Sequence, residues 1–118
     1  MKKKLLATLA CMALMSLAFA GLADARGTSA KVTIKANTIG FYGYVKSSKD
    51  KCASGREVKL FRITNSGKEK VGTDEAQANN DGYMWAIGVD RGGKYYAKVS
   101  ATDNGCDAAK SRILKAEL

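Results

Sequence analysis

The chain has 118 residues, with 20 Lys or Arg against 11 Asp or Glu, and its formal net charge at pH 7 is +9. It contains no His and no Pro. Without His, the chain can form no Ser-His-Asp triad, no Cys-His pair and no metal site based on imidazole. It also has no Gly-rich phosphate loop between a strand and a helix. We therefore expect a protein that is not an enzyme and holds no cofactor.

The N-terminal segment has the features of a secretory signal peptide. Three lysines follow the initial Met, residues 5–19 are almost wholly apolar, and two small-x-small motifs end at Ala20 and Ala25. Cleavage after Ala25 is the preferred prediction, with cleavage after Ala20 as the alternative. The sequence therefore predicts residues 1–25 as a signal peptide and residues 26–118 as one exported domain, either periplasmic or secreted.

Two other roles for this segment fit its length less well. A membrane anchor needs about 20 apolar residues, and the run here is shorter. A lipoprotein would use Cys11, which lies midway along the run and would leave an apolar region of about six residues, below the usual range. We expect no stable membrane insertion once the signal peptide has been removed.

Two cysteines remain in the exported part, Cys52 and Cys106. An even number of cysteines in an oxidising compartment predicts a disulfide. The bridge would close a loop of about 55 residues, for which the chain-entropy relation gives a stabilisation of about 4 kcal/mol. For a single small domain this is a large share of the net free energy of unfolding.

Seven short segments with alternating apolar residues follow the signal peptide, and turn-rich stretches separate them. They are residues 31–35, 39–46, 56–63, 70–73, 82–89, 94–100 and 111–118. The last segment is the most ambiguous, because residues 108–115 also fit a short helix. A polar run at residues 74–80 is expected to be a loop.

The segment 82–89 is predicted to be the centre of the core. Tyr83, Trp85 and Ile87 alternate with smaller residues, so their side chains fall on one face of a strand. Trp85 is the only Trp in the chain. In the segment 39–46, Gly43 interrupts a run of larger residues and predicts either a bulge or the close approach of a neighbouring residue.

Seven strands without a long helix predict an all-β fold, a seven-strand Greek-key β-sandwich of the Ig-like or prealbumin-like kind. In this topology the loop after the second strand and the loop before the seventh lie at the same end. Those two loops carry Cys52 and Cys106. A disulfide requires their Cα atoms to lie within about 7 Å, so strand order and cysteine placement agree.

Several segments resemble those of small secreted bacterial domains of the transthyretin-like or carboxypeptidase-regulatory-like group. They are Phe-Tyr-Gly-Tyr-Val at 41–45, Gly-Arg-Glu-Val-Lys-Leu-Phe at 55–61 after Cys52, Val-Gly-Thr at 71–73, Asn-Asp-Gly-Tyr-Met-Trp at 80–85 and Gly-Lys-Tyr-Tyr-Ala-Lys-Val at 93–99. The resemblance implies a prealbumin-like sandwich without catalytic residues. The cysteine pair departs from the family pattern.

The positive charge predicts a surface that binds anionic polymers. Eight cations follow one another along two segments: Lys46, Lys49, Lys51 and Arg56, then Lys59, Arg62, Lys68 and Lys70. Envelope glycans and lipid head groups are candidate partners, whereas nucleic acid is not expected for an exported protein. The alternative is that these lysines keep the protein soluble and protect edge strands from pairing with other sheets.

The acidic residues Asp74, Glu75 and Asp81 are close together in the sequence and suggest two further alternatives. A carboxylate pair there could support glycosidase-like chemistry, which needs a substantial cleft that a small sandwich does not offer. The oxygen-rich stretch 74–82 could hold Ca²⁺, although it lacks the Asp-x-Asp-x-Asp-Gly spacing. We expect neither an enzyme nor a metal site, and a solvated loop instead.

The tyrosines occur in two close pairs, Tyr42 with Tyr44 and Tyr95 with Tyr96. One of each pair is expected to point away from the core, where it could bind carbohydrate or protein, or be partly buried. Two functional hypotheses result. The first is a non-catalytic module that binds a protein or an anionic glycan at the cell envelope. The second is an inhibitor or effector that acts through the disulfide-tied loops 47–55 and 101–109.

Overall fold

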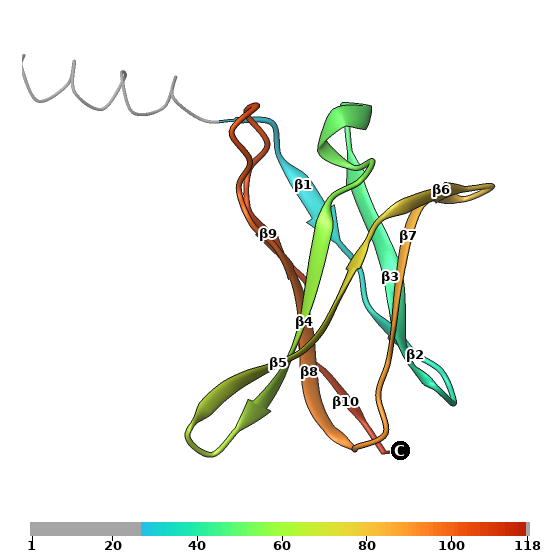
Figure 1. Cartoon of the computed structure of the whole chain (residues 1–118), viewed down its shortest axis with the longest axis vertical. Coiled ribbons are helices and arrows are strands. Elements are labelled where there is room, and N and C mark those ends of the chain that lie inside the picture. The colour runs from blue at the N-terminus through green and yellow to red at the C-terminus, as the bar shows by residue number, and fades with distance from the viewer. Residues whose placement is uncertain (1–26, 118) are drawn as a thin grey trace, which may run out of the picture.

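The computed structural model describes residues 27–117, which fold into an all-β domain with one short 3-10 turn, η1 (Asp50–Cys52) (Figure 1). In this part of the chain, no helix is long and apolar enough to cross a membrane. The predicted signal peptide and both of its cleavage sites lie outside the described residues. The ten strands are β1 (Ala30–Val32), β2 (Lys35–Ala36), β3 (Gly40–Ser47), β4 (Glu57–Thr64), β5 (Gly67–Glu75), β6 (Gln77–Asn79), β7 (Gly82–Gly88), β8 (Gly93–Val99), β9 (Ala109–Lys110) and β10 (Leu114–Ala116).

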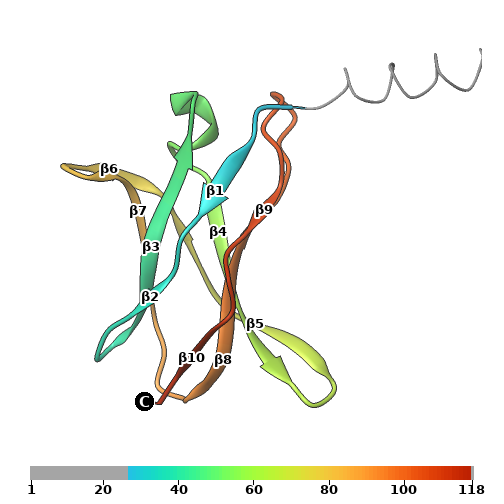
Figure 2. The ribbon, with the colours of Figure 1, turned by 180° about the vertical axis from the view of Figure 1, so that it is seen from behind.

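The strands form two antiparallel sheets that enclose the core (Figure 2). Sheet one has the order β1-β3-β7-β6, with β2 also paired to β3. Sheet two has the order β10-β8-β4-β5, with β9 also paired to β8. The predicted all-β class and the two-layered arrangement are therefore present in residues 27–117.

A hydroxyl residue interrupts the strand pairing at two places. One interruption divides the first predicted strand, 31–35, into β1 and β2, and the other separates β9 from β10, of which only β10 lies within the last predicted strand, 111–118. The Thr33 N–H donates to the Tyr44 carbonyl, and the Thr33 Oγ1 accepts the Tyr44 N–H at 2.8 Å. Ser111 makes the same pair of bonds with Ala97. In both places a side-chain oxygen takes the position of a backbone carbonyl, so the regular ladder stops and restarts. The alternative of a helix at 108–115 is wrong, because β9 and β10 both pair with β8.

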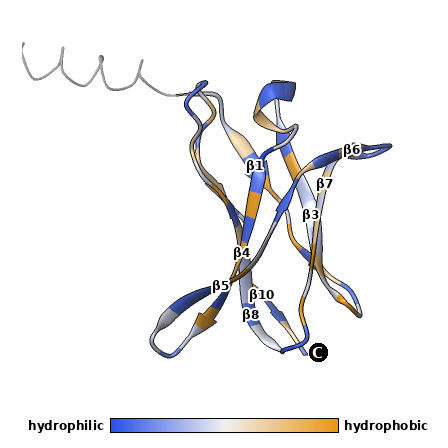
Figure 3. Cartoon of the chain, viewed as in Figure 1, coloured by the Kyte–Doolittle hydropathy of each residue, from blue (hydrophilic) through white to orange (hydrophobic). Residues whose placement is uncertain are grey.

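The polar run at residues 74–80 was expected to be a loop and is instead largely strand. β5 extends to Glu75, and after the single residue Ala76 the chain continues as β6 in the other sheet. Both strands are edge strands, and most of their residues are hydrophilic (Figure 3). Most of these residues are also exposed. A strand whose side chains are mostly exposed does not need apolar residues at alternate positions. The sequence of β5 and β6 therefore lacks the pattern by which a strand is predicted.

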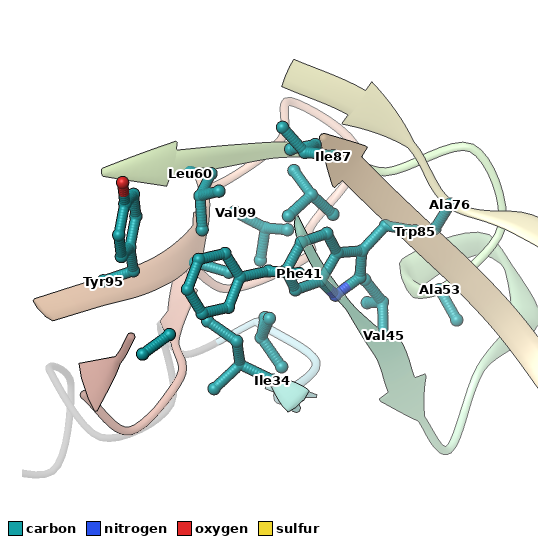
Figure 4. Packing of buried hydrophobic residues seen from close by; sticks show 14 residues of the cluster. Ile34, Phe41, Val45, Ala53, Leu60, Ala76, Trp85, Ile87, Tyr95 and Val99 are labelled. Carbon is teal, nitrogen blue, oxygen red and sulfur yellow. The ribbon is translucent and has the colours of Figure 1, made fainter. Parts of the chain in front are cut away.

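The core lies between the two sheets around Trp85, which is completely buried (Figure 4). Phe41 of sheet one contacts Tyr95 of sheet two, with ring centroids 4.5 Å apart. Ile87 is also buried and Tyr83 packs half-buried against the same cluster, as the alternation in this strand predicted. The rest of the buried apolar cluster is Val32, Ile34, Val45, Ala53, Val58, Leu60, Ala76, Ala97, Val99 and Ala116.

Gly43 makes room for a hydrogen bond to the buried indole. It lies directly opposite Trp85 in the pairing of β3 with β7. A Cβ at Gly43 would lie 1.9 Å from the Thr33 carbonyl oxygen, which accepts the Trp85 Nε1–H at 3.2 Å. The close approach predicted for Gly43 is therefore confirmed. It allows the carbonyl of Thr33, which lies between β1 and β2, to accept a hydrogen bond from the one polar group of the Trp85 side chain.

Replacing Gly43 by Ala should lower the free energy of unfolding by about 2 kcal/mol, because the added methyl group must displace a backbone carbonyl in a close-packed core. Urea denaturation followed by Trp85 fluorescence would measure the change. Gly88→Ala is the matched control in the same sheet, since its Cβ would meet its nearest neighbour, the Ile39 carbonyl oxygen, at an ordinary 3.5 Å. Equal stability of both variants would contradict this explanation of Gly43.

Candidate anion-binding face

The predicted disulfide joins the two end loops. Cys52, in η1, is bonded to Cys106, in the loop between β8 and β9, and their Cα atoms are 5.3 Å apart. Both cysteines are buried. The Lys51 ammonium adds a bond across the same end by donating to the Asn104 carbonyl at 2.9 Å. The end of the sandwich that carries loops 47–55 and 101–109 is therefore fixed by covalent and polar contacts.

Arg56 stabilises this disulfide-tied end of the sandwich. It therefore does not belong to the anion-binding surface that the sequence predicted. It is 4 % exposed. Its guanidinium donates to the carbonyl oxygens of Cys52, Ser100 and Asp107 at 2.8–2.9 Å. Burial lowers the pKa of Arg56 from its ordinary value, because the charged form loses solvation. The donors of this side chain are thus directed to backbone groups of three separate segments and not to solvent.

Arg56→Lys should lower the free energy of unfolding by about 2 kcal/mol. The planar guanidinium of Arg56 donates to three carbonyl oxygens at once, and a single lysine ammonium at this position cannot reach all three. Thermal and urea denaturation would measure it. Arg91→Lys is a suitable control, since the Arg91 side chain is 64 % exposed and surface substitutions usually change stability by less than about 0.5 kcal/mol. A variant at position 56 as stable as this control would show that the three bonds contribute little.

The outer face of sheet two carries a row of lysines that crosses three strands. In β4, Val58 and Leu60 are buried, so Lys59 between them points outward. Lys59 lies directly opposite Lys98 of β8, which in turn lies opposite Lys110 of β9. Neighbouring strands are about 4.8 Å apart. The row therefore places three lysines at directly opposite positions of three adjacent strands.

Two aromatic residues lie beside this row on the same face. Phe61 is directly opposite Tyr96, and their rings stack with centroids 5.4 Å apart. The Lys68 ammonium lies 4.8 Å from the centre of the Phe61 ring, and the Lys110 ammonium lies 5.4 Å from that of Tyr96. Both distances fall within the range of a cation–π contact. The stack thus holds two of the lysine side chains close to the sheet surface.

We call this surface the lysine face. Register and burial place seven lysines on it: Lys59, Lys68, Lys70, Lys94, Lys98, Lys110 and Lys115. Among the strands of sheet two, the outward carboxylates are Glu57 and Glu75, which face each other at one end of β4 and β5. Glu57 also lies 3.7 Å from the Lys59 ammonium. Within the strands of sheet two, the other charged side chains assigned to this face are the seven lysines.

The lysine face includes three of the eight cations singled out in the sequence, namely Lys59, Lys68 and Lys70. The remaining cations are elsewhere. Lys46 lies on the outer face of sheet one, and Lys49 and Lys51 lie at the disulfide-tied end. Arg62 donates to the Gly92 carbonyl, and Glu69 lies within 4 Å of both Arg62 and Arg91.

Four lysines of this face were missed by the sequence analysis: Lys94, Lys98, Lys110 and Lys115. Lys94 and Lys98 lie on one face of the predicted strand 94–100, and Tyr95, Ala97 and Val99 lie on the other. The alternation itself therefore contained a signal for these two lysines. Their position opposite Lys115 and Lys110 depends on pairing between segments distant in the chain. That register is not visible in local alternation.

The tyrosines divide differently from the prediction. Tyr95 is buried, and its hydroxyl donates to the Arg91 carbonyl. Tyr96 points to the outer face, although it is only 8 % exposed. One residue of this pair therefore does point away from the core. For the other pair the prediction is wrong, because Tyr42 and Tyr44 occupy alternate positions and both lie on the outer face of sheet one, half-buried.

The acidic residues near residue 80 are not brought together. The Asp74 carboxylate accepts the Ala86 N–H at 2.8 Å. Asp81 is exposed in the turn before β7, and about 13 Å of strand separates that turn from Ala86 at about 3.3 Å per residue. Within residues 27–117, no three His, Cys, Asp or Glu side chains form a group that could hold a metal ion. The structure therefore provides no shared site for Asp74 and Asp81.

Comparisons of the chain with profiles of protein families, with curated proteins and with solved structures found no match.

Proposed function

We propose that this protein is a non-catalytic binding module whose lysine face holds an anionic glycan. The observation that supports this most strongly is the row Lys59–Lys98–Lys110. Like charges directly opposite each other on a sheet are destabilising. Lys59 and Lys98 lie on β4 and β8, which are paired on both sides, so protection of a free edge does not explain them. A ligand with several negative charges would relieve this repulsion.

The shape of the face favours an extended polymer over a compact small molecule. Beside the row lies a shallow hollow of 310 Å³ with Lys68, Lys98 and Lys110 around Tyr96. Three ammonium groups around an aromatic ring would suit a ligand with one acidic group attached to a ring that has an apolar face. The ammonium groups would bind the acidic group, and the aromatic ring would contact the apolar face. A linear polymer of acidic sugars repeats such a unit, and its charges would meet the successive lysines of the row.

We also infer that the protein is exported and acts in the periplasm or outside the cell. The Cys52–Cys106 disulfide is compatible with this location, because disulfides persist in oxidising compartments.

We also infer that the fold is a seven-strand Greek-key sandwich of the transthyretin-like kind. The ten strands reduce to seven when β1 is counted with β2, β5 with β6 and β9 with β10. This count is supported because β1 and β2 share the partner β3, β9 and β10 share the partner β8, and β5 runs almost without a break into β6.

The test is binding of the oxidised protein to polygalacturonate, with neutral dextran as the control polymer, by isothermal titration calorimetry. We expect binding to polygalacturonate alone. The affinity should fall steeply as the ionic strength approaches about 1 M, where the Debye length is only about 3 Å. Equal binding of both polymers, or an affinity for polygalacturonate that does not change with salt, would contradict the proposal.

A second candidate function is an inhibitor or effector that acts through loops 47–55 and 101–109. The disulfide and the bonds from Arg56 and Lys51 favour it, because pre-organised loops lose little conformational entropy on binding a partner. Lys49 is exposed in the first of these loops. Loss of polymer binding on replacing Lys49 and Lys51 by Gln, with the lysine face intact, would favour this candidate over the first.

A further inference from the structure

The outer face of sheet one is also positively charged. Lys31 of β1 lies directly opposite Lys46 of β3, and Lys35 of β2 lies opposite Tyr42. All three lysines are exposed. Tyr42 and Tyr44 point outward between them, half-buried. We call this surface, made of Lys31, Lys35, Lys46, Tyr42 and Tyr44, the tyrosine face.

The sequence of sheet one leaves these charges without acidic neighbours in the sheet. None of its five strands contains Asp or Glu. Carboxylates occur just outside these strands: Asp50 in η1 after β3, Asp81 in the turn between β6 and β7, Asp90 after β7, and Asp74, whose carboxylate accepts the Ala86 N–H at the edge of β7. Lys46 lies in β3, which has partners on both sides, so edge protection does not account for its position opposite Lys31.

The tyrosine face and the lysine face lie on opposite sides of the domain. Packed sheets are about 10 Å apart, and the core around Trp85 fills the space between them. The ends of the sandwich separate the two surfaces, and the disulfide-tied loops occupy one of those ends (Figure 1). A short polymer that covers one face therefore cannot contact the other at the same time.

We propose that the domain binds two acidic polysaccharide chains at once, one on each face, and so cross-links them. This inference rests on the proposed function and adds a second site to it. The lysine face, with seven lysines, is the stronger site. The tyrosine face, with three lysines, is the weaker one, and its two tyrosine rings supply apolar area against which sugar rings pack.

The test is the stoichiometry with which the oxidised protein binds a galacturonate oligomer short enough to cover one face, measured by calorimetry. We expect two oligomers per chain for the unaltered protein. The variant K31Q/K35Q/K46Q should bind one, with the affinity of the first site changed by less than about threefold. With long polygalacturonate, the unaltered protein should raise light scattering to a maximum at an intermediate ratio, and this variant should not.

The outcomes separate the two proposals. One oligomer per chain in the unaltered protein, or undiminished scattering with K31Q/K35Q/K46Q, would overturn cross-linking and leave the proposed function standing. Absence of any binding would overturn both. The control K49Q/K51Q/R91Q removes the same number of positive charges from the ends of the sandwich and should keep two oligomers per chain. Loss of the second oligomer in this control would show that net charge or the disulfide-tied loops, and not the tyrosine face, determine its binding.

Discussion

Replacing both Cys52 and Cys106 by Ala should lower the free energy of unfolding by about 4 kcal/mol. The two residues are 54 positions apart, and cross-linking a loop of this length removes conformational entropy from the unfolded chain. A small domain has a net stability of only about 5–15 kcal/mol. The variant should therefore unfold at a much lower urea concentration, and equilibrium denaturation followed by Trp85 fluorescence would measure the difference.

Chemical reduction of the unaltered protein is the matching control, because it breaks the bridge without changing side-chain volume. Both treatments should give the same loss of stability to within about 1 kcal/mol. Mass spectrometry should show the native protein to be two hydrogens lighter than its reduced form. A native sample with two free thiols, or a loss of stability below about 1 kcal/mol, would contradict the role assigned to the disulfide.

Replacing Lys59, Lys98 and Lys110 together by Gln should weaken binding to polygalacturonate about 100-fold. A lysine near an anionic surface contributes about 1 kcal/mol to binding, and about 3 kcal/mol corresponds to a factor of somewhat more than 100. Folding should be nearly unaffected or improved, because the substitutions remove like charges that lie opposite each other. Calorimetric titration at low ionic strength would give the affinity, and thermal unfolding would give the stability.

The variant K49Q/K51Q/R91Q has the same net charge and serves as the control. It should bind polygalacturonate within about threefold of the unaltered protein, since its three substitutions lie off the lysine face. If both triple variants lost affinity equally, binding would depend on overall charge and not on the row. If the row variant kept full affinity, the lysine face would not be the binding site.

The parts of the fold that could be predicted from the sequence are those where alternation and burial coincide. In β3, β7 and β8, core-facing residues such as Phe41, Trp85 and Val99 occupy alternate positions, and the predicted strands match the structure closely. The run from β5 to β6 buries little, and its conformation depends on pairing with β4 and β7. Local pattern could not supply that information.

The candidate site was predictable only in part, for a similar reason. A cluster of cations in the sequence indicated an anion-binding surface, but membership of one face depends on which strands pair and in what register. Arg56, in Gly-Arg-Glu, has polar neighbours typical of an exposed residue, and only the folded chain brings the carbonyls of Ser100 and Asp107 to its guanidinium. Conversely, Lys110 joins Lys98 through a two-residue strand that has no alternation of its own.

The most direct test of the lysine face is to map the bound glycan by nuclear magnetic resonance. A short galacturonate oligomer would be added in small amounts to the isotopically labelled, oxidised protein, and the shifts of backbone amide signals would be followed. The first shifts should be centred on Lys59, Lys98 and Lys110 and on the Phe61–Tyr96 stack. Shifts confined to loops 47–55 and 101–109, with the amides of β4 and β8 unchanged, would contradict the account.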